Sequence, residues 1–304
     1  MTVKIRPEAE AILKDIEAVV FDIDGVLIDV SGSFRKTIVD TIQYYFQEVL
    51  KYSGDERLVR LEEIALFKKV GGFNNDWELT ESLALFCLAK AVKLDSKDLA
   101  VLRYQEPFLD GFVVAGVAEF EKAVVDLLDE KEKEVVLGLW NKALVRQIFQ
   151  EMYAGGKYCK DFYGFEPNYF KGEGTIKAEV ALLDTDLVKK PAAVITGRAK
   201  EEAKAAIEFT GLKVSDELVV CDNGQFRRKP DAQALTYVSD KMGVSLGLYI
   251  GDVRDDYQMV ANFNKLGNGK RFLSAIITEQ GDRFKEADVI AENVNEILRM
   301  VNNG

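Results

Sequence analysis

The 304-residue sequence contains no histidine. This absence excludes a Ser-His-Asp or Cys-His catalytic arrangement, an HExxH zinc site and a histidine-based pH switch. Acid–base chemistry near neutral pH must therefore come from carboxylates, or from Lys, Tyr or Cys side chains in suitable surroundings.

Cysteines are few, and long hydrophobic runs are missing. The three cysteines, Cys87, Cys159 and Cys221, lie far apart and form no CxxC pair, which predicts neither a disulfide framework nor a zinc cluster. The first twenty residues lack an apolar signal core, and no apolar run reaches membrane-spanning length. We therefore expect a cytoplasmic protein that has no membrane partner.

The charge balance is acidic, since 40 basic against 51 acidic residues gives 40 − 51 = −11. Nucleic-acid backbones are bound by basic surfaces, so we expect no nucleic-acid partner. A small phosphorylated ligand remains compatible with this charge, because its binding site can be locally positive. The apolar content of 48% indicates a globular chain with a sizeable core.

The hydrophobic pattern changes twice along the chain. A short β-branched run at 17–22 predicts a buried parallel strand. From Ser31 to about Tyr153, apolar residues recur at three- and four-residue steps, as in helices. Helices are expected at 34–50, 56–70, 76–92 and 135–153. Further strands are expected at 191–196, 217–222, 246–251 and 271–278, with helical segments between them. Strands that alternate with helices predict a parallel sheet in an α/β fold.

The sequence thus predicts an α/β core of residues 1–29 and 175–304, interrupted by a helical insertion of residues 30–174. The insertion follows the carboxyl end of the first strand, which is the edge where open α/β sheets bind ligands. We therefore expect the insertion to cover a binding site.

Four polar stretches follow predicted strands. In the first, DIDGVLID at 22–29, Asp22 and Asp24 stand two residues apart before a glycine. A carboxylate can attack phosphorus, and a second carboxyl beside it can protonate the leaving oxygen and later deprotonate water. The alternative is an ordinary acidic turn.

The second and third stretches offer groups that suit an anion. Thr196 and Gly197 supply a hydroxyl and main-chain N–H groups at a helix start, although Thr196 can instead be a helix N-cap. Lys229, within RRKPD, can neutralise charge on a transferring phosphoryl group, and the alternative is a solvated basic loop.

The fourth stretch, GDVRDD at 251–256, supplies carboxylates that can bind Mg²⁺ together with the first acid pair. The alternative for Asp255 or Asp256 is capping of the following helix, while Asp252 stays available to a metal.

In this order, DIDGVLID, ITGR, the lysine of RRKPD and GDVRDD resemble the four motifs of the haloacid dehalogenase (HAD) superfamily. The position of the insertion resembles the C1-cap members related to phosphoglycolate phosphatase. The resemblance implies a Rossmann-like core with a parallel sheet, and a large all-helical C1 cap after the first core strand. It also implies a Mg²⁺-dependent phosphatase that hydrolyses a small phosphorylated metabolite, a phosphomonoester, through an aspartyl-phosphate.

The same resemblance implies residue roles. Asp22 is the expected nucleophile and Asp24 the general acid/base, while Thr196 and Lys229 hold the phosphoryl group. The metal ligands are expected to be Asp22, Asp24 through its main-chain carbonyl, Asp252 and Asp256, with Asp255 as a further candidate. An acid at position 24 favours phosphoryl transfer over carbon–halogen cleavage. A phosphosugar mutase and a catalytically weak phospho-ligand-binding protein remain alternatives, and the oligomeric state is not predicted.

Specificity candidates lie in the insertion. Asn74 and Asn75, in the loop GGFNNDW, are candidates for substrate contact, with helix capping by Asn75 or Asp76 as the alternative. Arg35 is a candidate for binding a substrate carboxylate or phosphate, and the alternative is a surface helix arginine.

Overall fold

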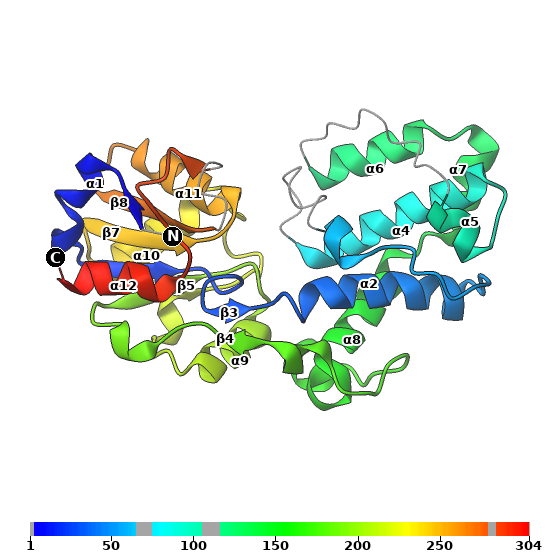
Figure 1. Ribbon diagram of the computed structural model, residues 1–304, viewed down its shortest axis with the longest axis horizontal. Coiled ribbons are helices and arrows are strands. Elements are labelled where there is room, and N and C mark those ends of the chain that lie inside the picture. Colours follow the sequence, from blue (N-terminus) through cyan, green and yellow to red (C-terminus); the bar gives the residue numbers. More distant parts are fainter. Residues whose placement is uncertain (1–2, 65–74, 105–115, 279–283, 304) are drawn as a thin grey trace. The chain divides into compact units, whose positions relative to one another are not determined.

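The structure is a computed structural model, and it describes residues 3–64, 75–104, 116–278 and 284–303. The chain divides into two compact units (Figure 1). We call Met1–Val30 together with Val180–Gly304 the α/β unit, and Ser31–Glu179 the helical unit.

A seven-stranded sheet forms the centre of the α/β unit. Its strand order is β1-β9-β8-β7-β2-β5-β6. The strands are β1 (Lys4–Ile5), β2 (Ala18–Phe21), β5 (Ala192–Ile195), β6 (Val219–Val220), β7 (Leu246–Gly251), β8 (Arg271–Ile277) and β9 (Val289–Ala291). All neighbouring pairs are parallel except β1 and β9. The α/β fold class expected from the sequence is therefore confirmed.

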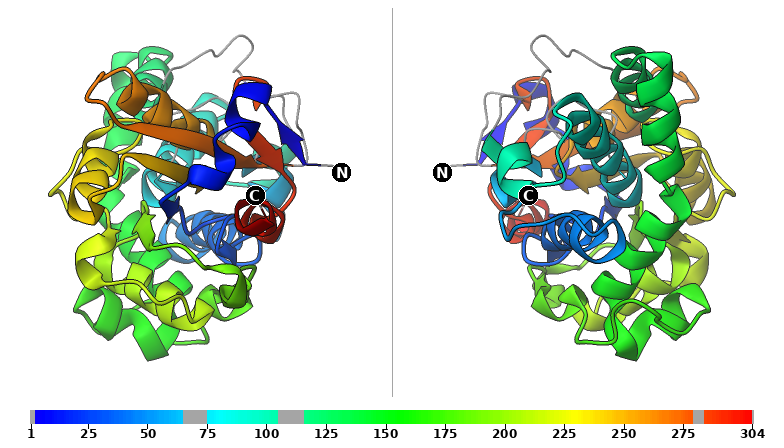
Figure 2. Two further views of the ribbon diagram at one scale, coloured as in Figure 1. Left: turned by 90° about the vertical axis from the view of Figure 1, so that its left-hand side faces the viewer. Right: turned by 90° about the vertical axis from the view of Figure 1, so that its right-hand side faces the viewer.

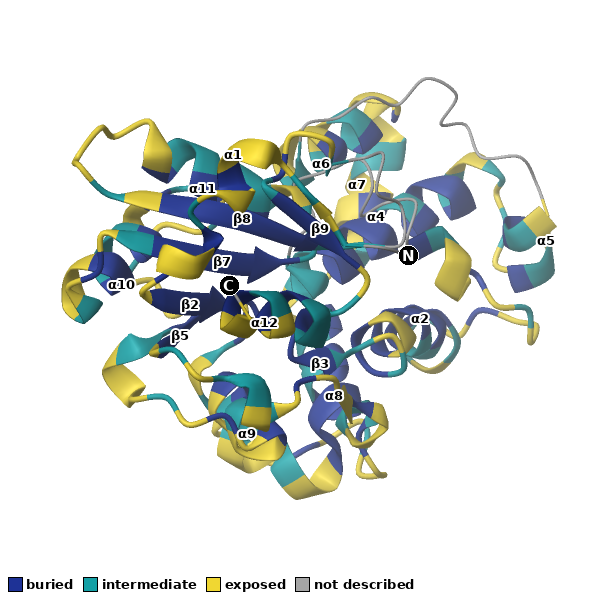
Figure 3. Cartoon of the chain, turned by 60° about the vertical axis from the view of Figure 1, so that its left-hand side comes forward, coloured by how far each residue is buried: buried dark blue, intermediate teal, exposed yellow. Residues whose placement is uncertain are grey.

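Helices cover both faces of this sheet, which explains why its strands are apolar throughout. Along β2, Val19 and Phe21 pack on the face covered by α9 (Lys200–Thr210) and α12 (Val294–Asn303). Their neighbours Ala18 and Val20 pack on the opposite face, against α10 (Gln233–Met242) and α11 (Arg254–Asn264). The buried strands lie between these two helical layers (Figure 3).

The chain leaves and re-enters the α/β unit through two paired segments. β3 (Ile28–Asp29) pairs with β4 (Val180–Ala181) in an antiparallel ladder. The return boundary lies after Glu179, five residues later than the predicted one after Gly174. The reason is that these residues belong to the helical unit: the Glu179 carboxylate accepts a hydrogen bond of 2.9 Å from the Tyr153 hydroxyl.

Helices make up most of the described part of the helical unit. Its α-helices there are α2 (Phe34–Tyr44), α4 (Asp76–Lys93), α5 (Leu99–Tyr104), α6 (Val117–Asp126), α7 (Glu130–Leu139) and α8 (Lys142–Tyr163), and the π-helix η2 (Tyr45–Val49) continues α2. The long α8 packs against α2 and α4 (Figure 2). Among the described residues of this unit there is no extended strand, as the sequence pattern predicts. None of the described helices has both the length and the apolar character needed to cross a membrane.

Two helix predictions in this unit need correction. The segment 135–153 contains two helices, because the Asn141 side chain accepts a hydrogen bond from the Leu144 N–H and starts α8 afresh. In the segment 56–70, residues 61–64 are helical and residues 56–60 are not, and residues 65–70 lie outside the described part. Its first residues are not helical because their N–H groups bond side chains, as Leu58 does with Gln43 at 3.2 Å.

Candidate active site

The order of the strands determines which polar residues meet. β2 lies between β5 and β7, and its last residue, Phe21, pairs with Val194 and Ile250. The residues that follow these parallel strands therefore emerge at one edge of the sheet. Asp22, Thr196 and Asp252 occupy those positions.

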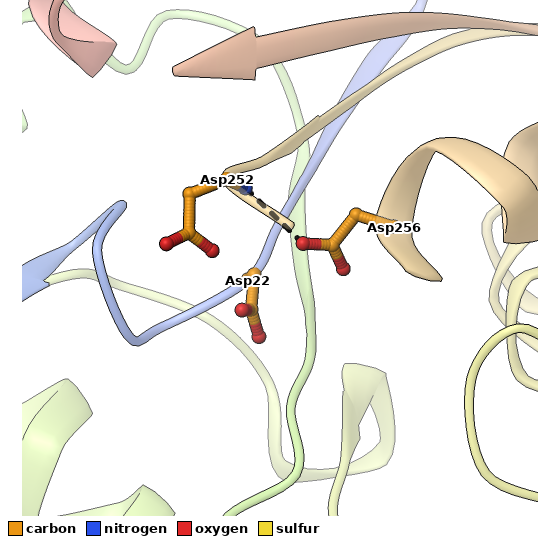
Figure 4. Close-up of side chains that lie close together, drawn as sticks. All are labelled: Asp22, Asp252 and Asp256. Carbon is orange, nitrogen blue, oxygen red and sulfur yellow. Dashed lines mark hydrogen bonds between the residues drawn. The ribbon is translucent and has the colours of Figure 1, made fainter. Parts of the chain in front are cut away.

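Three carboxylates gather at this edge (Figure 4). Asp22, Asp252 and Asp256 each offer an oxygen, and these oxygens lie within 4.8 Å of one another. We call these three residues the acid cluster. Asp22 is 7% exposed and Asp256 is fully buried. Mutual repulsion of carboxylates so poorly hydrated requires nearby positive charge.

Lys229 supplies part of that charge. Its ammonium lies 2.8 Å from Asp22 Oδ1 and 2.7 Å from Asp256 Oδ1. The alternative of a solvated basic loop is wrong for Lys229, whose side chain is 12% exposed, but it describes the neighbouring Arg227, which is 81% exposed. Lys229 therefore lies at the acid cluster, and its contact with a phosphoryl group stays a prediction.

Asp256 connects Lys229 to the main chain of the fourth motif. Its Oδ1 accepts hydrogen bonds from Lys229 and from the Tyr249 hydroxyl at 2.9 Å. Its Oδ2 accepts from the main-chain N–H groups of Asp252 and Val253 at 3.1 and 3.2 Å. Because α11 begins at Arg254, Asp256 also caps the helix start, so capping and membership of the acid cluster coexist.

The buried charges shift the ionisation of their neighbours. Burial, opposed by Lys229 and reinforced by Asp256 and Asp24, raises the pKa of Asp22 to about 7. Burial alone would lower the pKa of Lys229, but Asp22 and Asp256 hold that pKa well above its usual value. The ammonium contacts two of the three carboxylates of the acid cluster, and the close approach of these acids favours a further cation. Carboxylate oxygens are the ligands that Mg²⁺ prefers, so the donor set fits a divalent ion.

Gly25 allows the first and fourth motifs to touch. It adopts a φ of +76°, which glycine tolerates better than any other residue. A Cβ at this position would stand 2.3 Å from Asp252 Oδ2. Any larger residue would therefore displace the Asp252 carboxylate from its place beside Asp22.

Asp24 does not join the acid cluster with its side chain. Its Oδ1 instead accepts a hydrogen bond of 2.8 Å from Arg198 Nε and lies 2.7 Å from Arg198 Nη2 in the same ion pair. Sequence reasoning gave Arg198 no role, although a cation directly after Thr196 and Gly197, at an edge rich in acids, is a usable signal. Tyr249 was also missed, and its signal is a hydroxyl inside an otherwise apolar strand.

The second motif contributes the Thr196 hydroxyl and an exposed glycine, Gly197. Thr196 is 5% exposed, and its Oγ1 accepts a hydrogen bond from the Arg198 N–H at 3.2 Å. The alternative of Thr196 as helix N-cap is wrong, because α9 begins at Lys200 after the cap residue Ala199. Gly197 is exposed, and a Cβ there would meet nothing within 4 Å.

The remaining candidates belong to the helical unit. Asn75 is the N-cap of α4, because its side-chain oxygen accepts from the N–H groups of Trp77 and Glu78 at 2.9 and 3.1 Å. Arg35 is exposed on α2. Asn74 lies outside the described residues. Substrate contacts of these residues, and the role of the helical unit as a cap, stay predictions.

Comparison with known proteins places this geometry in context. Residues 16–264 match the family of haloacid dehalogenase-like hydrolases. No functionally curated protein matches the sequence. Among solved structures, a phosphatase from Thermococcus thioreducens, Tt82, is 22% identical, with a TM-score of 0.65 over 94% of this chain and 100% of that one. A structural-genomics target is 14% identical, with a TM-score of 0.63 over 95% and 99% of the two chains. These likenesses concern the fold.

The raised pKa of Asp22 predicts how the stability of the metal-free protein depends on pH. The folded chain favours the protonated carboxyl, so the free energy of unfolding should fall as pH rises from the ordinary value of 3.8 to about 7. With no histidine in the chain, few other groups titrate in the upper half of this window. Unfolding in EDTA should show this fall, and Asp22→Asn should flatten it.

Asp216→Asn is the matched control, because Asp216 is an exposed acid of the same unit. It should keep the slope of the wild-type protein. Equal slopes in wild type and Asp22→Asn would contradict the assignment of this titration to Asp22.

Proposed function

Because the chain belongs to the family of haloacid dehalogenase-like hydrolases, we propose that it is a Mg²⁺-dependent phosphatase of small phosphomonoesters. The observation that carries this proposal is the ion pair of 2.8 Å between Lys229 and Asp22 within the acid cluster. A carboxylate can attack an anionic phosphate ester only where cations offset the repulsion between the two anions. A buried aspartate beside an ammonium and two further carboxylates supplies that setting.

Asp22 and Asp252 would hold the metal, together with the main-chain carbonyl of Asp24. When bound, Mg²⁺ would offset the negative charge of Asp22 and of the phosphoryl oxygens. We assign Asp256 a supporting position, in contrast to the sequence expectation of a direct ligand. Each of its two oxygens already accepts two hydrogen bonds, which engages the available lone pairs.

The proposed reaction has two steps. In the first, an oxygen of Asp22 attacks phosphorus, the ester P–O bond breaks, and Asp24 gives its proton to the departing oxygen. In the second, water loses a proton to Asp24, and the water oxygen bonds phosphorus. The bond between Asp22 and phosphorus then breaks and inorganic phosphate leaves. One water is consumed for each alcohol and phosphate formed.

The remaining residues would bind the phosphoryl group. Lys229 would offset charge on the transferring group while it stays paired with Asp22. The Thr196 hydroxyl and the main-chain N–H of Gly197 would donate to phosphoryl oxygens. The exposure of Gly197 supports this role, since a Cβ there would meet nothing within 4 Å among the described residues.

Replacing the nucleophile tests this proposal. Wild-type protein with Mg²⁺ should release phosphate from p-nitrophenyl phosphate, and EDTA should abolish the release. Asp22→Asn should lower kcat by about a thousandfold or more, because an amide cannot attack phosphorus. Asp216→Asn should leave kcat unchanged. Retained activity in Asp22→Asn would remove the nucleophile assignment, and phosphosugar isomerisation without phosphate release would favour the mutase.

Gly25→Ala tests the contact between the first and fourth motifs, where Gly25 lies against Asp252. The added Cβ should displace Asp252 and raise the Kd for Mg²⁺ by about tenfold or more, as measured by calorimetry. The matched control is Gly211→Ala, since Gly211 has a similar φ of +74° but open space around it. Both variants should lose stability through the positive φ, and Gly25→Ala should lose more because of the added contact with Asp252. Unchanged Mg²⁺ affinity in Gly25→Ala would contradict the proposed role of Asp252.

A further inference from the structure

We propose that Arg198 is a positioning residue that holds one oxygen of Asp24 and so presents the other to the reacting oxygen. The inference rests on the proposed phosphatase function, in which Asp24 transfers protons. It deepens that proposal by naming what fixes the orientation of the proton-transferring carboxyl.

The first observation is the geometry of the ion pair. Arg198 Nε and Nη2 lie 2.8 and 2.7 Å from the same atom, Asp24 Oδ1. In the described part of the chain, the hydrogen bond from Arg198 and the ion-pair contact of 2.7 Å both go to Oδ1. Two guanidinium nitrogens on one oxygen hold that oxygen in place more firmly than a single contact does. Oδ2 is therefore the oxygen left for a leaving group or a water molecule.

The second observation is the contrast in burial between the two partners. The Arg198 side chain is 1% exposed, whereas that of Asp24 is 32% exposed. A guanidinium with so little exposure has little room to reach a substrate. Its Nε and Nη2 atoms already contact Asp24 Oδ1. Asp24 is open to an incoming molecule on the side that Arg198 does not occupy. The arginine therefore acts through Asp24 and not on the substrate directly.

The third observation is that the main chain of Arg198 is itself held at the site. Its N–H donates to Thr196 Oγ1 at 3.2 Å, and its carbonyl accepts from the Asp222 N–H at 3.0 Å. Arg198 thus links the hydroxyl proposed to bind phosphate with the carboxyl proposed to transfer protons. Movement of either group relative to the other is restricted by a single residue.

Electrostatic repulsion explains why Asp24 needs such a partner. Asp22 and Asp24 repel each other, and that repulsion contributes to the raised pKa of Asp22. A carboxylate at position 24 with no cation beside it would turn away from Asp22 toward solvent. The Arg198 guanidinium provides a fixed attraction that opposes this movement.

The test compares two esters that share a ring but differ in the leaving oxygen. p-Nitrophenyl phosphate releases a stable phenolate that needs little protonation, whereas phenyl phosphate depends more on a general acid. For Arg198→Met, kcat/KM should fall about tenfold further on phenyl phosphate than on p-nitrophenyl phosphate. In Arg198→Lys the extra loss of kcat/KM on phenyl phosphate should be smaller than in Arg198→Met. Lysine keeps the positive charge but lacks the two guanidinium donors that contact Asp24. A merely structural role for Arg198 would lower both values equally.

A double-mutant cycle tests whether Arg198 acts through Asp24. In an Asp24→Asn background, adding Arg198→Met should cause no further loss and no further change in the ratio between the two esters. Arg227→Met is the matched control, because Arg227 is an exposed arginine of the same unit, and it should behave as wild type. Thermal unfolding checks that each variant is folded. If Arg198→Met does not fold, Arg198→Lys carries the same comparison.

The outcomes separate this inference from the function on which it rests. Equal losses on the two esters, or additive losses in the cycle, in an otherwise active enzyme would overturn the role of Arg198 alone. Absence of Mg²⁺-dependent phosphate release by the wild-type protein would overturn the proposed function and the role of Arg198 with it.

Discussion

The site depends on one interaction, the contact of the Lys229 ammonium with two buried carboxylates, Asp22 and Asp256. Without that cation, three acids within 4.8 Å would repel one another in a region that water barely reaches. With it, the charge is only partly balanced. The pKa of Asp22 is raised mainly by burial, and repulsion from Asp256 and Asp24 raises it further. The excess of negative charge favours binding of the proposed metal. The bound metal would in turn offset the further negative charge that an anionic ester brings to the site.

The fold creates this contact through the order of its strands. Because β2 runs between β5 and β7, the first, second and fourth motifs start from adjacent strand ends. Apolar residues on both faces of the sheet fix those ends, and the glycine turn at Gly25 lets the loop after β2 approach Asp252. Asp256 then joins Lys229 to the start of α11. The apolar strands, the glycine turn and the start of α11 therefore hold the acids in place.

Much of the core and the acid cluster could be predicted from the sequence, because short apolar runs identify parallel strands and polar residues follow their ends. The pairing of Arg198 with Asp24 and the four hydrogen bonds of Asp256 could not, because they depend on contacts between distant segments. The same holds for the non-helical residues 56–60 and for Asn141, where side chains compete with helical hydrogen bonds. The short edge strand β1 has too few residues to give a pattern.

Identification of the phosphorylated side chain tests the central claim most directly. Turnover of p-nitrophenyl phosphate with Mg²⁺ would be quenched rapidly and treated with borohydride, which reduces an aspartyl-phosphate to homoserine. Mass spectrometry of the peptides should then find homoserine at position 22 in the wild-type protein and no such product in Asp22→Asn. Homoserine at another position, or none while phosphate is released, would contradict the account.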